Sequence, residues 1–302
     1  MVDDDLSRSS EALAKLALAQ AHVDNLIHNV TEQIDLLTFD PENQELLTAL
    51  VEGLSDQRDA VRLRVSEILG EIGEPATPVL TTALANHQNS LVRWGCAKSL
   101  SLIGDPSAIP ALISALLNDQ DTMVKGSAAG ALARTGEDAV PELIKLLEAV
   151  NTSESIKGHA AWALAFIGAE AKELLYKALA TDNVTVRAAV MAAIAKVAKE
   201  YPDDDNFSIL INGLNDDAET VCSQAATALG DLAHKPAVPA LIKLLEHPLW
   251  ETRKSAILAL MKIGDASVLD NLKSASLSDS EANSAPIYNL AINQLEKKVV
   301  TD

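Results

Sequence analysis

The feature that most constrains this chain is a 13-residue motif that occurs seven times. The central copy, residues 156–168, reads IKGHAAWALAFIG, and the copies begin at residues 61, 92, 124, 156, 186, 221 and 252. Self-similarity every 30 to 35 residues is typical of a solenoid, in which each repeat packs only against its neighbours. We therefore predict an all-α fold, an α-solenoid of stacked antiparallel helix pairs with helical caps.

Each repeat is predicted to hold two helices, A and B. In the first repeat, residues 42–54 form helix A and residues 60–73 form helix B. Asp, Asn and Ser gather in the turns before helix B, where they cap free N–H groups, and glycine commonly follows helix B. The predicted organisation is an N-terminal helical cap (1–41), seven repeats (42–265), and a degenerate C-terminal capping repeat with a tail (266–302). Within the fifth repeat, residues 200–206 are predicted to form a longer, charged loop.

Composition narrows the classes of partner. The chain has 24 Lys and Arg against 43 Asp and Glu, a net charge of −19. Such a surface repels phosphate, so we expect neither nucleic acid nor an anionic membrane as a partner. No apolar stretch resembles a signal peptide or a membrane span, and two cysteines in distant repeats suit a reducing compartment. We expect a soluble cytoplasmic protein.

The repeat sequences resemble HEAT repeats, and more narrowly the HEAT-like repeats of the phycobilisome lyase group of cyanobacteria and red algae. Residues 92–117 (VRWGCAKSLSLIGDPSAIPALISALL) and 158–168 (GHAAWALAFIG) carry this resemblance, which covers roughly residues 42–277. It implies an E/F-type phycobilin lyase subunit or related bilin chaperone, which helps attach an open-chain tetrapyrrole to a cysteine of a phycobiliprotein. It also implies a phycobiliprotein subunit as partner, a second HEAT-like lyase subunit as a further one, and the plastid stroma if the chain is plastid-encoded.

One face of helix B varies from repeat to repeat. The positions three, six and ten residues after the first motif residue share a helix face, which we call the helix-B stripe. In the central repeat these are His159, Trp162 and Phe166, and small residues occupy the stripe in the two neighbouring repeats. Arg134 and Lys196 follow those small residues. The pattern suggests a recess with an aromatic floor and a cationic edge.

Such a recess would suit a flat tetrapyrrole with two propionates, bound transiently by Arg134, His159, Trp162, Phe166 and Lys196. His159 is the candidate acid or base, because it alone on the stripe titrates near neutral pH. Stripe carboxylates such as Glu67, Glu71 and Asp231 could accept hydrogen bonds from pyrrole N–H groups or contact a partner. The alternative is that the aromatic side chains pack against neighbouring helices.

Two further positions are interpreted structurally. An Arg or Lys recurs just after the first motif residue and is predicted to pair with aspartates of the turns. Cys96 is predicted to be a small buried residue. Cys222 replaces the recurring cation, so we expect it to be more exposed, and a transient thioether to bilin is conceivable there.

The enzyme class stays open. No nucleotide-binding loop, zinc cluster or serine-hydrolase motif is visible, and no metal site is predicted. HEAT-like deoxyhypusine hydroxylases rely on His-Glu pairs, and no His-Glu occurs here. The leading hypothesis is a bilin lyase, which forms or breaks a C–S bond, or a bilin chaperone without a tightly bound cofactor. The alternatives are a non-catalytic HEAT scaffold that binds a protein in its groove and a related protein that detaches bilins during phycobilisome breakdown.

Overall fold

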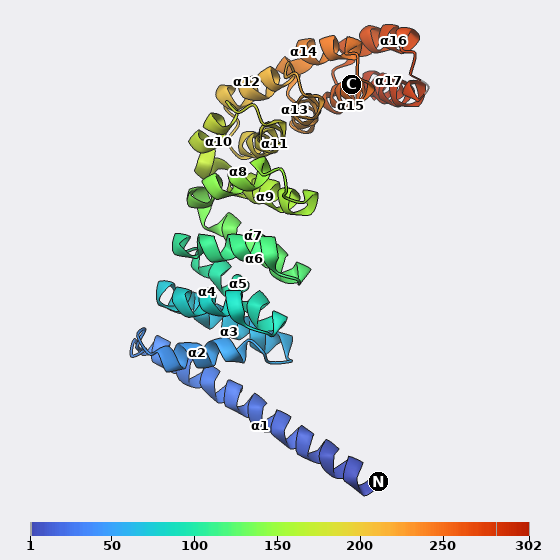
Figure 1. Cartoon of the computed structure of the whole chain (residues 1–302). Coiled ribbons are helices and arrows are strands. Elements are labelled where there is room, and N and C mark those ends of the chain that lie inside the picture. The colour runs from blue at the N-terminus through green and yellow to red at the C-terminus, as the bar shows by residue number, and fades with distance from the viewer. Residues whose placement is uncertain (1, 282, 302) are drawn as a thin grey trace. The chain divides into compact units, whose positions relative to one another are not determined.

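The structure is a computed structural model that describes residues 2–281 and 283–301. Throughout these residues the regular structure is helical, and no strand occurs in them. The predicted all-α repeat fold is confirmed. Contacts divide the chain into two compact units, Met1–Ala139 and Val140–Asp302, and each is a stack of helix pairs (Figure 1).

The first unit holds a long N-terminal helix and three helix pairs. The long helix α1 packs through its C-terminal half on α2 and α3, where Val30 is fully buried. Short 3₁₀ turns precede α4 and α6. The helices are α1 (Val2–Asp35), α2 (Gln44–Gly53), α3 (Asp59–Ile72), α4 (Thr77–Asn86), α5 (Ser90–Ile103), α6 (Ile109–Asn118) and α7 (Thr122–Arg134).

The second unit continues the same alternation of A and B helices and ends with the pair α16 and α17. Helix B of each repeat packs against helix B of the next, as α9 does on α11 and α13 on α15. The helices are α8 (Val140–Glu148), α9 (Glu154–Ile167), α10 (Lys172–Ala178), α11 (Val184–Glu200), α12 (Asp204–Gly213), α13 (Glu219–Asp231), α14 (Val238–Lys243), α15 (Trp250–Ile263), α16 (Leu269–Ser278) and α17 (Ser284–Thr301).

The core of each stack is built from the apolar positions of the motif. In α9, Ala160, Ala163 and Leu164 have no solvent-exposed surface, and the equivalent residues of the other B helices are buried as well. Alanine lets neighbouring helices approach closely, while each fully buried leucine contributes about 1.5–3 kcal/mol. The polar turns and the apolar helix faces therefore fix which side of each B helix meets solvent.

Glycine ends several B helices for a conformational reason. Gly104 and Gly264 follow α5 and α15 with a φ of 72° each, which is the left-handed conformation that L-residues adopt only at a cost. After α13 the equivalent turn contains Ala233, with a φ of 49°. An alanine there carries strain that the glycine ends avoid.

The prediction of a loop over residues 200–206 is wrong, because the loop in the structure is shorter. Helix α11 runs to Glu200 and α12 begins at Asp204, so only residues 201–203 connect them. The side chain of Asp203 accepts a hydrogen bond from the backbone N–H of Asn206, 2.7 Å away, and so starts α12 early. The extra residues of the fifth repeat lengthen α11 to 17 residues instead of forming a loop.

Candidate functional site

The helix-B stripe faces solvent at most of its positions. In α13, for example, Gln224, Thr227 and Asp231 are all exposed. Gly95 and Ala189 are exceptions, because these two small residues are buried against neighbouring helices. Most of the stripe in each unit is thus accessible, as expected for a binding surface and not for a core.

An aromatic pair stands on the stripe of α9. Trp162 is 51% exposed and Phe166 is 41% exposed, so neither side chain is enclosed between helices. Their ring centroids lie 5.5 Å apart with the planes tilted by 34°. Large aromatic side chains that remain half accessible are typical of ligand or partner contacts.

Lys196 joins this pair from the neighbouring helix. Its Nζ lies 4.7 Å from the centroid of the Phe166 ring, a cation–π distance, and 3.4 Å from the carbonyl oxygen of Phe166, to which it donates a hydrogen bond. Lys196 forms no ion pair with a carboxylate of the described residues. The structure therefore brings an aromatic surface and an uncompensated ammonium group together.

His159 lies one helical turn before Trp162 and is half-buried. Its Nδ1 is 2.8 Å from the backbone carbonyl oxygen of Ser155. A carbonyl only accepts, so in this geometry Nδ1 carries the hydrogen and donates it. Nε2 then keeps its lone pair and can act as a hydrogen-bond acceptor or a base.

Arg134 is the last residue of α7 and belongs to the first unit. Its side chain is exposed and has no hydrogen-bond or ion-pair partner among the described residues. The structure thus brings Trp162, Phe166 and Lys196 together and places Arg134 on a different compact unit. Lys98 on α5 is a second stripe cation without a partner there, and sequence reasoning did not select it.

The stripe carboxylates already have partners of opposite charge. Arg64 lies 3.0 Å from Glu71 and 3.5 Å from Glu67, and Lys262 of α15 pairs with Asp231 of α13. These carboxylates are engaged on the protein itself, so they are weaker acceptors for a pyrrole N–H than the sequence suggested.

Lys157 pairs with Glu154 of its own helix, whereas three of the six recurring cations form an inter-repeat structure that we call the Arg–Asp ladder. In each case the guanidinium makes two hydrogen bonds to an aspartate in the next turn and further ones to carbonyl groups of its own turn. The predicted pairing with turn aspartates is confirmed for Arg93–Asp119, Arg187–Asp216 and Arg253–Asp279.

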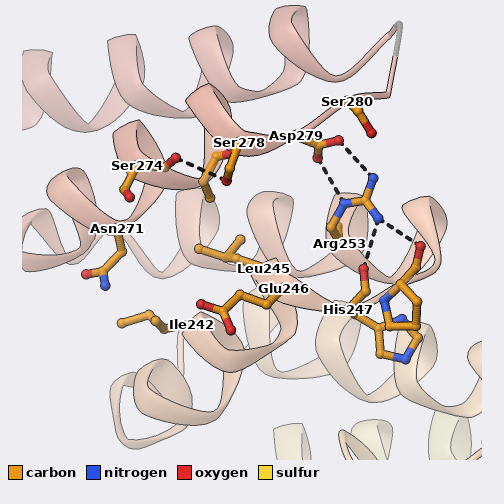
Figure 2. Close-up of a pocket in the computed structure, with 12 residues that line it drawn as sticks. Ile242, Leu245, Glu246, His247, Arg253, Asn271, Ser274, Ser278, Asp279 and Ser280 are labelled. Carbon is orange, nitrogen blue, oxygen red and sulfur yellow. Dashed lines mark hydrogen bonds and ion pairs between the residues drawn. The ribbon is translucent and has the colours of Figure 1, made fainter.

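A hollow of about 420 Å³ beside one ladder pair is shown in Figure 2. Arg253 lies between the carboxylate of Asp279 and the carbonyl of His247, and both polar and apolar side chains line the rest. A counterpart of about 250 Å³ surrounds Arg93, with His87 and Asp119 in matching places. Because the guanidinium in each hollow is paired with an aspartate of the next turn, these hollows belong to the architecture of the repeat.

Neither thiol lies in surroundings that make a cysteine reactive. Cys96 is fully buried, as predicted, and burial raises its pKa to about 12. The expectation that Cys222 is more exposed is wrong, because only 1% of it is accessible. Its Sγ donates to the carbonyl oxygen of Asp216, 2.8 Å away, and burial raises the pKa of this thiol too. A buried, protonated thiol does not suit a transient thioether.

Among the residues that the structure describes, no three His, Cys, Asp or Glu side chains form a group that could hold a metal ion. None of the helices in this part of the chain is both long and apolar enough to cross a membrane.

Comparisons with known proteins agree with the repeat architecture. The family model of HEAT repeats matches residues 47–133, 109–195 and 207–290. The bilin biosynthesis protein MpeU of Synechococcus sp. (strain WH8020) is 34% identical over 283 residues, which are 93% of each chain.

Among solved structures, a chain of the Kap95:Nup1 complex is similar over 86% of this chain and 42% of that one, at 17% identity and a TM-score of 0.50. This likeness shows the fold alone. Human deoxyhypusine hydroxylase in complex with glycerol matches 84% of this chain and 96% of that one, at 21% identity. Its TM-score of 0.36 is too low to support a shared function.

Proposed function

The chain belongs to the HEAT-repeat proteins and, among them, to the phycobilisome lyase group that its repeats resemble, and on this basis we propose that it acts in bilin biosynthesis. Its role would be that of a bilin lyase or bilin-binding chaperone, which helps attach an open-chain tetrapyrrole to a cysteine of a phycobiliprotein. The observation that carries this proposal is the accessible aromatic pair Trp162–Phe166 with Lys196 beside it.

The aromatic pair fits the shape of such a ligand. A conjugated tetrapyrrole offers an extended flat face, and the half-exposed rings of Trp162 and Phe166 offer apolar surface that a flat ligand would cover. Lys196 supplies a positive charge at the edge of the Phe166 ring, where it can meet a propionate. Arg134 is a further candidate cation on the first unit.

Attachment requires little chemistry from the protein. The thiol of the acceptor adds across a carbon–carbon double bond of the bilin, so an S–C bond forms and the thiol proton ends on carbon. Holding the two reactants in position is the main contribution a scaffold can make. Nε2 of His159 is the candidate to accept or return the proton, because Nδ1 is held by Ser155.

Other parts of the proposal follow from the same assignment. The partners would be a phycobiliprotein subunit and, as a further candidate, a second HEAT-like lyase subunit. The bilin would be a transient ligand, phycocyanobilin or phycoerythrobilin, not a resident cofactor. The protein would work in the cytoplasm, or in the plastid stroma if plastid-encoded, and its two free buried thiols are compatible with a reducing compartment.

The test is a titration of the purified protein with phycocyanobilin and phycoerythrobilin, followed by visible absorbance and fluorescence. We expect a sharpened, red-shifted bilin band, and about fivefold weaker binding by Trp162→Ala. Leu290→Ala is the matched control, because Leu290 on α17 is 51% exposed, as Trp162 is, and lies outside the helix-B stripe. It should bind as the unmodified protein does.

Transfer is then measured with an acceptor apoprotein that carries one reactive cysteine. Faster formation of the covalent adduct supports the lyase, and binding with protection but no acceleration supports the chaperone. If the protein changes neither bilin spectrum, alone or with a co-purified second subunit, the proposal is wrong. The exposed aromatic pair would then be assigned to a protein partner, as in the scaffold alternative.

A further inference from the structure

Two stripe cations of the first unit differ from the other cations on this face. Lys98 of α5 and Arg134 of α7 have no hydrogen-bond or ion-pair partner among the described residues. Elsewhere on the stripe, Arg64 and Lys262 are each neutralised by stripe carboxylates, and Lys196 donates to the carbonyl oxygen of Phe166. In a chain with 43 acidic and 24 basic residues, two adjacent repeats that leave their stripe cations uncompensated mark a local positive surface.

The helix packing brings these two cations within reach of one ligand. Helices α5 and α7 lie side by side, and Arg134 is one helical turn further along its helix than Lys98 is. Neighbouring helices are about 9 Å apart and four residues rise about 6 Å, which gives roughly 11 Å between the two Cα atoms. Both side chains are long enough to approach a group held between them.

The surface between the cations leaves room for that group. Gly130 occupies the stripe position on α7 that matches Lys98, and a Cβ there would meet no atom within 4 Å. Leu102 matches Arg134 on α5 and is 45% exposed. Each of the two helices thus carries one cation and one uncharged position. The position that matches Lys98 is the open space above Gly130, and the position that matches Arg134 is the exposed side chain of Leu102.

The helix dipole explains only one of the two cations. Arg134 ends α7, where a positive charge is stabilised by the helix C-terminus. Lys98 lies in the interior of α5, which spans Ser90–Ile103, so no such effect accounts for it. Stabilisation by the helix C-terminus therefore accounts for Arg134 but not for Lys98.

From this juxtaposition we infer that Lys98 and Arg134 form a carboxylate-binding site on the first unit. This inference rests on the proposed function, in which the ligand is a bilin, and the carboxylate bound here is then a propionate. A guanidinium and an ammonium both donate charge-assisted hydrogen bonds to carboxylates, and Arg can do so in a two-pronged geometry. The site therefore recognises the ligand with ionised carboxylates and not its ester.

The test compares phycocyanobilin with its dimethyl ester, which has the same chromophore but no carboxylates. Both are titrated against the full-length protein, the Lys98→Met/Arg134→Met variant, and the matched Arg64→Met/Lys262→Met variant. The two double variants lose one Lys and one Arg each, so they change the net charge equally. Circular dichroism and thermal unfolding establish that all three proteins are folded.

We expect the unmodified protein and the matched variant to bind the free acid about tenfold or more tightly than the ester. In the Lys98→Met/Arg134→Met variant this preference should fall about threefold or more, because two cations that would meet a propionate are lost. An unchanged preference in that variant, or an equal loss in both variants, would overturn the inference.

The two ways of failing are distinguishable. If the unmodified protein binds acid and ester equally well, the carboxylate site is wrong while bilin binding stands. If it binds neither compound, the proposed function fails and the carboxylate site fails with it.

Discussion

Removal of Arg93 should destabilise the protein far more than removal of a comparable surface arginine. In Arg93→Met, the guanidinium that joins α5 to the next turn is lost, while the apolar stem of the side chain is kept. Its Nε and one terminal nitrogen lie 2.7 and 2.9 Å from the two carboxylate oxygens of Asp119. The other terminal nitrogen donates to the carbonyls of His87 and Gln88 at 2.8 and 3.1 Å.

The magnitude follows from how little of this cluster meets water. The side chains of Arg93 and Asp119 are 16% and 6% exposed. Breaking a fully buried ion pair by removing one partner costs about 3–5 kcal/mol, because the other charge stays buried. Asp119 keeps one bond from the backbone N–H of Asp121, and water can reach the remaining gap, so we expect about 2–3 kcal/mol here.

Urea unfolding followed by circular dichroism measures this difference, and Arg64→Met is the control. Arg64 forms ion pairs too, but its side chain is 36% exposed and its partners Glu67 and Glu71 are 46% and 44% exposed. Pairs of this kind contribute about 0–1 kcal/mol. Equal losses of unfolding free energy in the two variants would refute the view that burial makes the ladder strong.

The effect of Arg93→Met should also depend on pH. Hydrogen bonds from Arg93 hold the pKa of the Asp119 carboxyl below its usual range. A carboxyl with a lowered pKa in the folded state stabilises the protein above its unfolded pKa of about 3.9, and this contribution is lost as the pH falls through the folded value. The difference between the variant and the unmodified protein should therefore be full at pH 7 and shrink below about pH 4.

Three further outcomes are expected. Cys96 and Cys222 are buried with raised pKa values, so neither thiol should react with a thiol reagent at pH 8 until the protein is unfolded, as a colorimetric titration would show. Ala233→Gly should raise the unfolding free energy by about 0.5–1 kcal/mol, since φ is positive there, and a loss of stability would contradict that reading. Asn206→Ala should lower it by about 1–3 kcal/mol, because this buried amide bonds a tyrosine hydroxyl and a backbone carbonyl, and a shift in thermal unfolding would report it.

The repeat architecture was largely predictable because one sequence motif occurs seven times along the chain. The B helices, their buried alanine and leucine positions and the glycine that ends five of the seven follow from residue type and spacing alone. The segment at residues 200–206 misled because its charge and its proline suggested a loop. In the structure, Asp203 uses the same polarity to cap the next helix.

The sequence predicted which residues of the candidate site share a helix face, but not how exposed they are or which side chains surround them. Spacing placed His159, Trp162 and Phe166 on one face, and only coordinates could show that the rings stay accessible and that Lys196 lies over one of them. The position of Cys222 was also clear from the repeat. Its burial was not, since it depends on a turn carbonyl that closes over the thiol.

The Arg–Asp ladder is missing in some repeats. A repeat without a ladder pair lacks one of the interactions that couple it to the next repeat. In the second unit, Arg187 and Arg253 are tied to the following repeat, whereas Lys157 of α9 pairs with Glu154 of its own helix. The stability of a repeat protein is roughly a sum of local terms and nearest-neighbour couplings. Because no ladder pair ties α9 to the following repeat, the helix bearing Trp162 and Phe166 should open and exchange its amide hydrogens at a lower free energy than α11 or α15. The surface offered to a ligand would then also be a cooperative boundary of the fold.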